Sequence, residues 1–205
     1  TGWRRSWLKK SCVLACNRFA LLNCQALENC GMRLLTLLSL ILFIAGCTSL
    51  PPGVEPVRPF DATRYLGTWY EIARLDHSFE RGLEQVSATY SRREDGGISV
   101  LNKGYSPESG QWKQAQGKAY LVGDGQSGHL KVSFFGPFYS AYGIFGLDQQ
   151  DYQYAFVSGY NTDYLWLLAR TPTFSQAVMA QFEAQARALG FATDKLIYVR
   201  QDVAE

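Results

Sequence analysis

Short runs of alternating apolar and polar residues fill the chain from Tyr65 to Arg170, and turn-forming residues separate them. Alternation with a period of two is typical of strands that bury one face, and Asp95-Gly96-Gly97 is one of several recognisable turns. The predicted strands are 66–75, 85–91, 97–104, 112–122, 129–135, 140–147, 152–159 and 164–170. Eight strands at hairpin spacing predict an all-β fold, an up-and-down antiparallel barrel, because closing the sheet removes its open edges.

The period of the pattern changes after Pro172. Apolar residues then recur every three or four positions, which predicts one face of a helix. They are Phe174, Val178, Phe182, Ala186 and Leu189. The stretch Thr173-Phe174-Ser175-Gln176 resembles a capping box, and Gly190 is a suitable end. We expect one C-terminal α-helix packed on the outside of the barrel, followed by a short final strand at 196–199.

An apolar run at residues 34–45 follows Met32 and the basic Arg33. Twelve helical residues rise only about 18 Å, less than the bilayer core of about 30 Å. A basic residue, a short apolar stretch and small residues at its end are typical of a secretory signal. A buried core helix is the alternative, but this run has no polar face.

Ile44-Ala45-Gly46-Cys47 ends this run and resembles a bacterial lipobox. The resemblance implies that the Cys47 thiol receives a diacylglycerol and that the signal peptide is cut before it. The new amino group is then acylated, and three acyl chains form an essentially permanent membrane anchor. Thr48 stands where inner-membrane retention would require aspartate, so the outer membrane is favoured.

The expected domain organisation follows from these features. Met32 is expected to be the true start, so 1–31 is an extension added by gene assignment or cloning, or an unusually long basic leader. Residues 32–46 form the lipoprotein signal peptide, and 47–60 contain the lipidated cysteine and a linker. Four prolines in residues 51–59 predict a stiff, extended spacer. The barrel domain covers 61–202.

Charge and cysteine content exclude several functions. Residues 48–205 carry 14 basic and 17 acidic groups, so the folded part lacks the concentrated basic face of a nucleic-acid binder. All five cysteines lie in the first 47 residues, where their loose spacing and the lack of histidine make a zinc site improbable. His77 and His129 have no metal-ligand spacing. No metal and no cofactor are therefore expected.

Three motifs in order make the strand pattern specific. Gly67-Thr68-Trp69 opens the first strand, Asn161-Thr162-Asp163-Tyr164 joins the last two, and Arg170 ends the eighth. Together they resemble the three signatures of the lipocalin family, over roughly residues 60 to 200. The longer phrases 65–74, 131–139 and 164–172 are similar to the bacterial outer-membrane members of that family.

The resemblance gives three residues a structural role. In the family, the tryptophan of the first strand plugs the closed end of the barrel, and an arginine from the last strand stacks on it. Carried onto this sequence, these are Trp69 and Arg170, with Gly67 beside them. We expect a cation–π pair in a partly desolvated place.

A barrel of this size can hold one small ligand, and alternation predicts its lining. If Arg170 points inward, so do Leu168, Trp166 and Tyr164, and if Trp69 does, so do Glu71 and Ala73. The candidate ligand-binding residues are Ala88, Tyr90, Val100, Asn102, Tyr142, Ile144 and Trp166. This lining of aromatic and aliphatic groups with few polar ones suits an acyl chain. Each side chain could instead simply fill the interior.

Glu71 is unusual because a carboxylate inside a barrel needs a partner or a proton. It could pair with an arginine, or the strand register could differ there. Catalytic signals are absent from the domain, which has no Gly-x-Ser-x-Gly elbow, phosphate-binding loop or cysteine after Cys47. The protein is therefore not expected to be an enzyme.

The leading hypothesis is a lipid-anchored outer-membrane protein of a Gram-negative bacterium, on the periplasmic face. It would store or transport single-chain lipids, such as lysophospholipids or fatty acids, for membrane maintenance. Its partners would be the lipid ligand and the membrane, without nucleic acid, and a homodimer is left open. The alternatives are a binder of a pigment or haem, a barrel enzyme acting on lipids through Glu71 or a tyrosine, and a structural envelope protein with a filled barrel.

Overall fold

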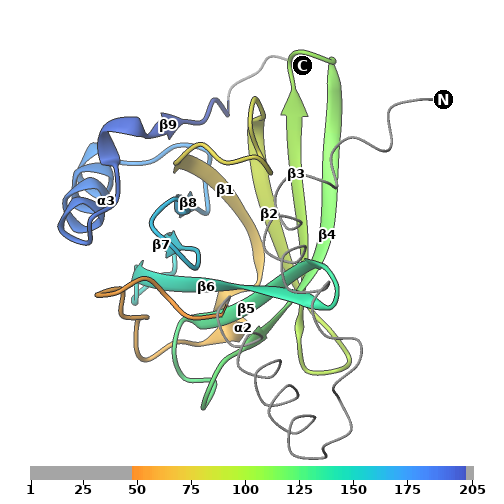
Figure 1. Cartoon of the computed structure of the whole chain (residues 1–205), viewed down its shortest axis with the longest axis vertical. Coiled ribbons are helices and arrows are strands. Elements are labelled where there is room, and N and C mark those ends of the chain that lie inside the picture. Colours follow the sequence, from red (N-terminus) through yellow and green to blue (C-terminus); the bar gives the residue numbers. More distant parts are fainter. Residues whose placement is uncertain (1–47, 202–205) are drawn as a thin grey trace, which may run out of the picture. The chain divides into compact units, whose positions relative to one another are not determined.

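The computed structural model describes residues 48–201, which form a closed antiparallel barrel (Figure 1). The strands are β1 Gly67–Arg74, β2 Glu84–Arg92, β3 Ile98–Ser106, β4 Gln111–Leu121, β5 His129–Phe135, β6 Phe138–Leu147, β7 Tyr154–Ser158, β8 Leu165–Ala169 and β9 Ile197–Tyr198. Each of the first eight strands pairs with the next, and β1 pairs with both β2 and β8. The predicted all-β fold and its eight-stranded up-and-down barrel are confirmed.

Most strand limits fall within two residues of the predicted ones, and β5 matches at both ends. The seventh strand begins later than predicted, at Tyr154. Tyr152 belongs instead to the preceding turn, where its φ is 56° and its N–H donates to the Asp148 carbonyl over 2.9 Å. A left-handed backbone of this kind departs from the extended conformation of a regular strand.

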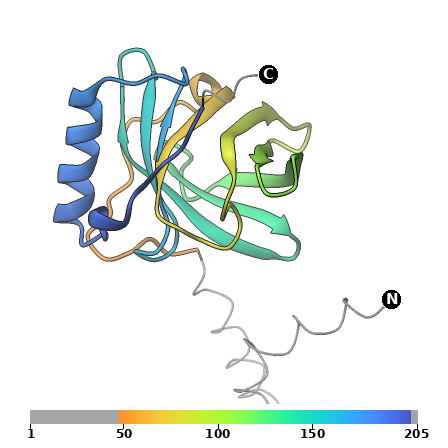
Figure 2. The ribbon, with the colours of Figure 1, turned by 90° about the horizontal axis from the view of Figure 1, so that it is seen from above.

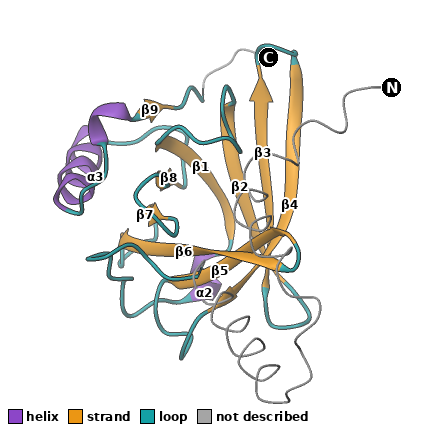
Figure 3. Ribbon diagram, viewed as in Figure 1, coloured by secondary structure: helices purple, strands orange, loops and turns teal. Residues whose placement is uncertain are grey.

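The long helix that follows the eighth strand lies outside the barrel (Figure 3). Helix α3, Gln176–Ala188, runs beside the barrel wall in Figure 2 and buries Met179, Phe182 and Ala186. These side chains pack with outward-facing residues of β1, β7 and β8, including Ile72, Phe156 and Leu167. The predicted helix and its place outside the barrel are confirmed, and β9 is the short final strand, paired with β1.

Details of the helix differ from the prediction. Ser175, not Thr173, is the N-cap, and its Oγ accepts a hydrogen bond from the Val178 N–H. Phe174 therefore precedes the helix and is 43% exposed. The predicted apolar face is wrong at that position because the helix starts later. A short helix, α2 Ala62–Tyr65, and a 3₁₀ turn, Thr193–Lys195, were not predicted.

The proline-rich segment packs on the barrel wall. The Val57 N–H donates to the Ile144 carbonyl over 2.8 Å, and the Gly128 N–H donates to the Val57 carbonyl over 3.0 Å. Val54 and Phe60 are both buried, at 6% exposure. The described part of the segment is thus part of the fold, and the spacer expected from its prolines is not what the structure shows.

Two ends of the barrel follow from its topology, because consecutive connections of an up-and-down barrel alternate between ends. We call the end with connections 75–83, 107–110, 136–137 and 159–164 the mouth. The opposite end, where α2 precedes β1, is the base. No helix within residues 48–201 is long and apolar enough to cross a membrane.

Candidate functional site

The base is closed around Trp69 and Arg170. The Arg170 Cζ lies 3.9 Å from the centre of the Trp69 ring, which is fully buried. The guanidinium donates to the carbonyls of Thr68, Arg64 and Tyr152 over 3.0, 2.7 and 3.2 Å. The structure therefore brings together the two residues that the sequence signatures single out.

Gly67 is required beside this pair for two reasons. Its φ is +98°, a conformation that residues with a side chain rarely adopt. A Cβ at this position would also lie 3.2 Å from Arg170 Nη1. A larger residue would therefore strain the backbone and push the arginine away from Trp69.

The barrel interior gathers most of the expected lining residues. Tyr90, Val100 and Ile144 are buried in one apolar cluster with Trp69. Ala88, Tyr142 and Trp166 are partly buried against the same cluster, and Leu168 belongs to it. The predicted candidates thus share one interior, although their contact with a ligand stays a prediction.

Sequence analysis missed the opposite wall of the interior. Leu130, Val132 and Phe134 of β5 and Ala119 of β4 also line the cluster. The signal was available, because these β5 residues alternate with His129, Lys131 and Ser133 along the strand. Their parity could have been assigned from the same rule that was applied to β8.

Three tyrosine hydroxyls meet inside the barrel. Tyr142 Oη lies 2.8 Å from Tyr65 Oη and 3.0 Å from Tyr90 Oη, so each hydroxyl has a partner. Burial raises the pKa of all three phenols well above the ordinary value. They are therefore neutral polar groups in an apolar surrounding.

Asn102 is the amide of the interior. It faces Ala88 of β2 and Ala115 of β4 across the sheet. Its Oδ1 is buried and has no hydrogen-bond partner among residues 48–201. Buried polar groups are normally paired, so this one is available to a ligand.

A β-bulge reverses the side-chain pattern of β1. Glu71 faces Leu168, but the register then shifts so that Ala73 faces Leu167. Ala73 therefore points to the cluster under α3, and its predicted inward orientation is wrong. The bulge adds one residue to the strand and turns Arg74 inward beside Glu71.

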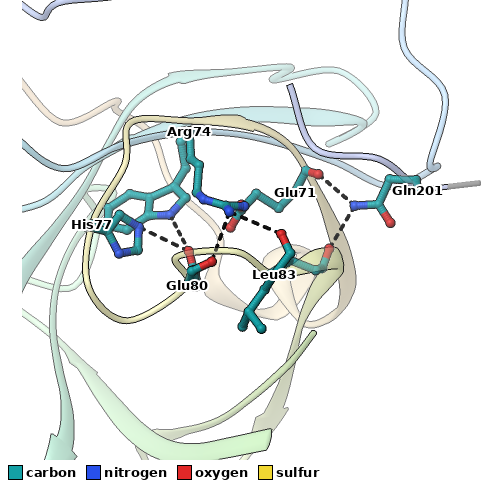
Figure 4. A network of polar contacts seen from close by, with 8 residues as sticks. Glu71, Arg74, His77, Glu80, Leu83 and Gln201 are labelled. Carbon is teal, nitrogen blue, oxygen red and sulfur yellow. Dashed lines mark hydrogen bonds and ion pairs between the residues drawn. The ribbon is translucent and has the colours of Figure 1, made fainter. Parts of the chain in front are cut away.

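A buried polar network forms at the mouth as a result (Figure 4). Arg74 Nη1 donates to Glu71 Oε1 over 2.6 Å, and both side chains are almost fully buried. Arg74 Nη2 donates to the carbonyls of Glu80 and Leu83 over 2.9 and 3.1 Å. Arg74 thus connects β1 to the 75–83 connection that crosses the mouth.

Glu80 joins the network from this connection. Its Oε2 accepts a hydrogen bond from Trp166 Nε1 over 3.1 Å and lies 3.1 Å from His77 Nε2. The His77 ring also contacts Trp166 and Tyr164, with centroids 5.1 and 5.5 Å apart. Tyr164, which was expected to point inward, therefore lies among the aromatic rings at the mouth.

The pKa values of the two carboxyl groups shift in opposite directions. Burial, and then the neighbouring Glu80, raise the pKa of Glu71 well above the usual value, although Arg74 opposes this. Burial alone would raise the pKa of Glu80, but contacts with His77, Glu71 and Trp166 outweigh it and lower that pKa. The Arg74 guanidinium contacts the Glu71 carboxyl group and the Glu80 main-chain carbonyl, while the Glu80 carboxyl group is held by His77 and Trp166.

The structure identifies the partner of the buried Glu71 carboxyl group. Its partner is Arg74 of the same strand, which sequence analysis missed because a regular strand would place residues 71 and 74 on opposite faces.

His129 lies apart from the mouth network, with Nε2 2.9 Å from the Thr48 carbonyl. In the described residues, no three His, Cys, Asp or Glu side chains group to hold a metal ion. Cys47 lies outside those residues.

Clear relatives exist for both sequence and fold. A profile of the lipocalin-like domain matches residues 60–201. The outer membrane lipoprotein Blc of Vibrio cholerae is 56% identical over 170 residues, 83% of this chain and 99% of that protein. Blc of Escherichia coli K12 is 53% identical over 175 residues, or 83% and 98% of the two chains. The structure of insecticyanin from the tobacco hornworm matches with a TM-score of 0.61 at 21% identity, covering 77% and 88%, a likeness in fold alone.

Proposed function

This chain belongs to the lipocalin family, and from that premise we propose that it binds single-chain lipids inside its barrel while anchored to the outer membrane. Lipocalins are binding proteins for small ligands rather than enzymes. Lysophospholipids and fatty acids are the proposed ligands, which the protein would store or carry for membrane maintenance.

The incomplete packing of the interior is the observation that carries this proposal. Ala88, Asn102, Tyr142 and Trp166 face inward, yet each is only half-buried. The wall between them is mostly apolar, so it suits an acyl chain. Burying such a chain contributes roughly 0.8 kcal/mol per CH₂, which favours a long hydrocarbon ligand over a compact one.

The anchor is proposed from the sequence and supported by the relatives. Cys47 ends a signal-type apolar run, and the relatives from Vibrio cholerae and Escherichia coli, covered almost completely by the match, are named outer membrane lipoproteins. Their names support the outer membrane as the location of this chain. We propose that the barrel lies on its periplasmic face, where it would meet lipids of the adjacent leaflet.

Filling the interior should abolish lipid binding. Ala88→Phe places a large ring inside the barrel and should weaken binding of a fluorescent fatty acid at least about tenfold, because overpacking costs ~1–3 kcal/mol. Thr89→Phe is the matched control, since the next residue of β2 points outward and contacts Thr68 Oγ1. Titration of the purified, delipidated protein measures both. Failure of the unsubstituted protein to bind any acyl probe at micromolar concentration would contradict the proposal.

Lipidation at Cys47 should be visible in the mass of the protein extracted from membranes. We expect a mature chain that begins at Cys47 and carries the mass of three acyl chains, together with any co-purified lipid. Cys47→Ala should remain unprocessed. Detection of an unacylated chain that keeps residues before Cys47 would contradict the proposed membrane anchor. It would not affect the proposal of ligand binding.

A further inference from the structure

A lysine and an amide lie on the inward face of the β3–β4 ribbon near the mouth. Asn102 faces Ala115, and Gly104 faces Lys113, in the antiparallel pairing. Directly opposed residues share a face, and positions two apart along a strand share it too. Asn102 also faces Ala88, which packs on the interior cluster. Lys113 is therefore on the inward face, one step closer to the mouth than Asn102.

The opposite face of the ribbon confirms this assignment. Lys103 and Trp112 stand on it together, with Lys103 Nζ 4.1 Å from the centre of the indole ring. Tyr105 contacts the same ring at a centroid distance of 5.6 Å. The two lysines of this region thus point to opposite sides of the sheet, and they differ in whether they have a partner.

Lys113 has no ion-pair or hydrogen-bond partner among residues 48–201. The other inward-facing cations are all engaged. Arg74 is balanced in the mouth network, Arg170 stacks on Trp69, and Arg92 donates to Thr63 Oγ1 over 3.1 Å. Lys113 is exposed to solvent at the start of β4, and it is the inward-facing cation near the mouth that remains free for a ligand.

Small residues lie beside Asn102 on the inward face. Ala88 and Ala115 face it directly on the two neighbouring strands. Lys113 and Ala115 are two residues apart, or about 7 Å along the strand, which a lysine side chain can span. This separation matches a head group a few atoms across, with its acyl chain directed into the apolar interior.

We propose that Lys113 and Asn102 form the head-group site and select single-chain lipids with an anionic head, a carboxylate or a phosphate. The inference rests on the proposed function, because it assigns the polar end of the same ligand. Lys113 supplies the charge and Asn102 Nδ2 donates a hydrogen bond to the anionic oxygen, while Oδ1 accepts from a hydroxyl of the ligand where one is present. The acyl chain packs against the cluster above Trp69. Charge-assisted hydrogen bonds to anionic oxygen are among the stronger polar contacts.

The test compares a fatty acid with the fatty alcohol of the same chain length in the delipidated protein. The unsubstituted protein should bind the acid about tenfold more tightly at low salt. Lys113→Met should remove this preference and leave alcohol affinity within about twofold. Lys103→Met, on the outward face, is the matched control and should keep the preference. Asn102→Leu should weaken acid and alcohol alike, because both heads form hydrogen bonds.

The outcomes separate this proposal from the function on which it rests. Binding of acid and alcohol with equal affinity, or a preference that survives Lys113→Met, would overturn the head-group site alone. Failure of all acyl probes to bind would overturn the proposed function. A lysophospholipid arm distinguishes the source of the anion. If Lys113→Met weakens binding of both the fatty acid and the lysophospholipid, the site accepts either a carboxylate or a phosphate. If it weakens binding of only one of them, the site is specific for the anion of that ligand.

Discussion

Arg74→Met is expected to destabilise the fold by roughly 3–5 kcal/mol, because it removes one partner of a buried ion pair. Glu71 would lose its partner at 2.6 Å, and the carbonyls of Glu80 and Leu83 would lose their donor. The 75–83 connection should then open at the mouth. Urea unfolding measures the stability, and trypsin cleavage after the exposed Arg81 measures the opening.

Glu71→Gln is the matched control for this substitution. Burial raises the pKa of Glu71, so glutamine copies its neutral form and should change stability by less than about 1 kcal/mol at a pH near the ordinary pKa of a glutamate. The two proteins should diverge as the pH rises above that ordinary value. A raised pKa stabilises the fold below the ordinary value, and this contribution is lost as the pH rises through the raised value, by up to about 1.4 kcal/mol per pH unit. Glutamine has no proton to lose, so the substituted protein should not show that decline.

Glu80 should change the stability of the fold at acid pH, in the direction opposite to Glu71. Its pKa is lowered, so its stabilisation is present above the ordinary value and lost as the pH falls through the lowered one. The unsubstituted protein and Glu71→Gln should both show this decline in stability.

If Arg74→Met instead unfolds at the same urea concentration as the unsubstituted protein and resists trypsin equally, the network does not hold the 75–83 connection in place.

Regular alternation made most of the barrel predictable from the sequence. Strand β8 buries Leu165 and Leu167 against α3 and turns Trp166 and Leu168 inward, as its parity requires. The same rule placed Ala88 and Tyr142 correctly because their strands are regular at those positions. The interior residues of β5 alternate just as regularly, and the same rule would have found them.

The errors arose where a local feature breaks that period. A single extra residue in β1 moved Ala73 to the outer face and brought Arg74 inside, and no pattern in the strand announces it. The partners of Arg74 are carbonyls of an irregular connection, which periodicity cannot place. Prolines predicted an isolated spacer, yet Val57 uses its backbone groups to extend along the barrel wall.

Both ends of the barrel depend on an arginine that collects carbonyl groups from separate segments. Arg74 joins β1 to the connection across the mouth, and Arg170 joins α2, β1 and the turn at Tyr152 at the base. No cysteine lies among the described residues, so packing and these polar contacts carry the stability of the barrel. The base is filled by the fully buried Trp69 ring.

Trp69→Ala is expected to cost about 3–5 kcal/mol, because it leaves a cavity where a fully buried indole now packs. Tyr65 would lose its stacking partner at 4.7 Å, and Arg170 would lose the ring that it covers. Trp112→Ala is the control, since that indole is 46% exposed and its contact with Lys103 contributes only ~0.5–1 kcal/mol. Trp69→Phe should fall between the two and keep the protein folded. Urea unfolding followed by circular dichroism ranks the three, and equal losses for Trp69→Ala and Trp112→Ala would show that the base is not closed by this pair.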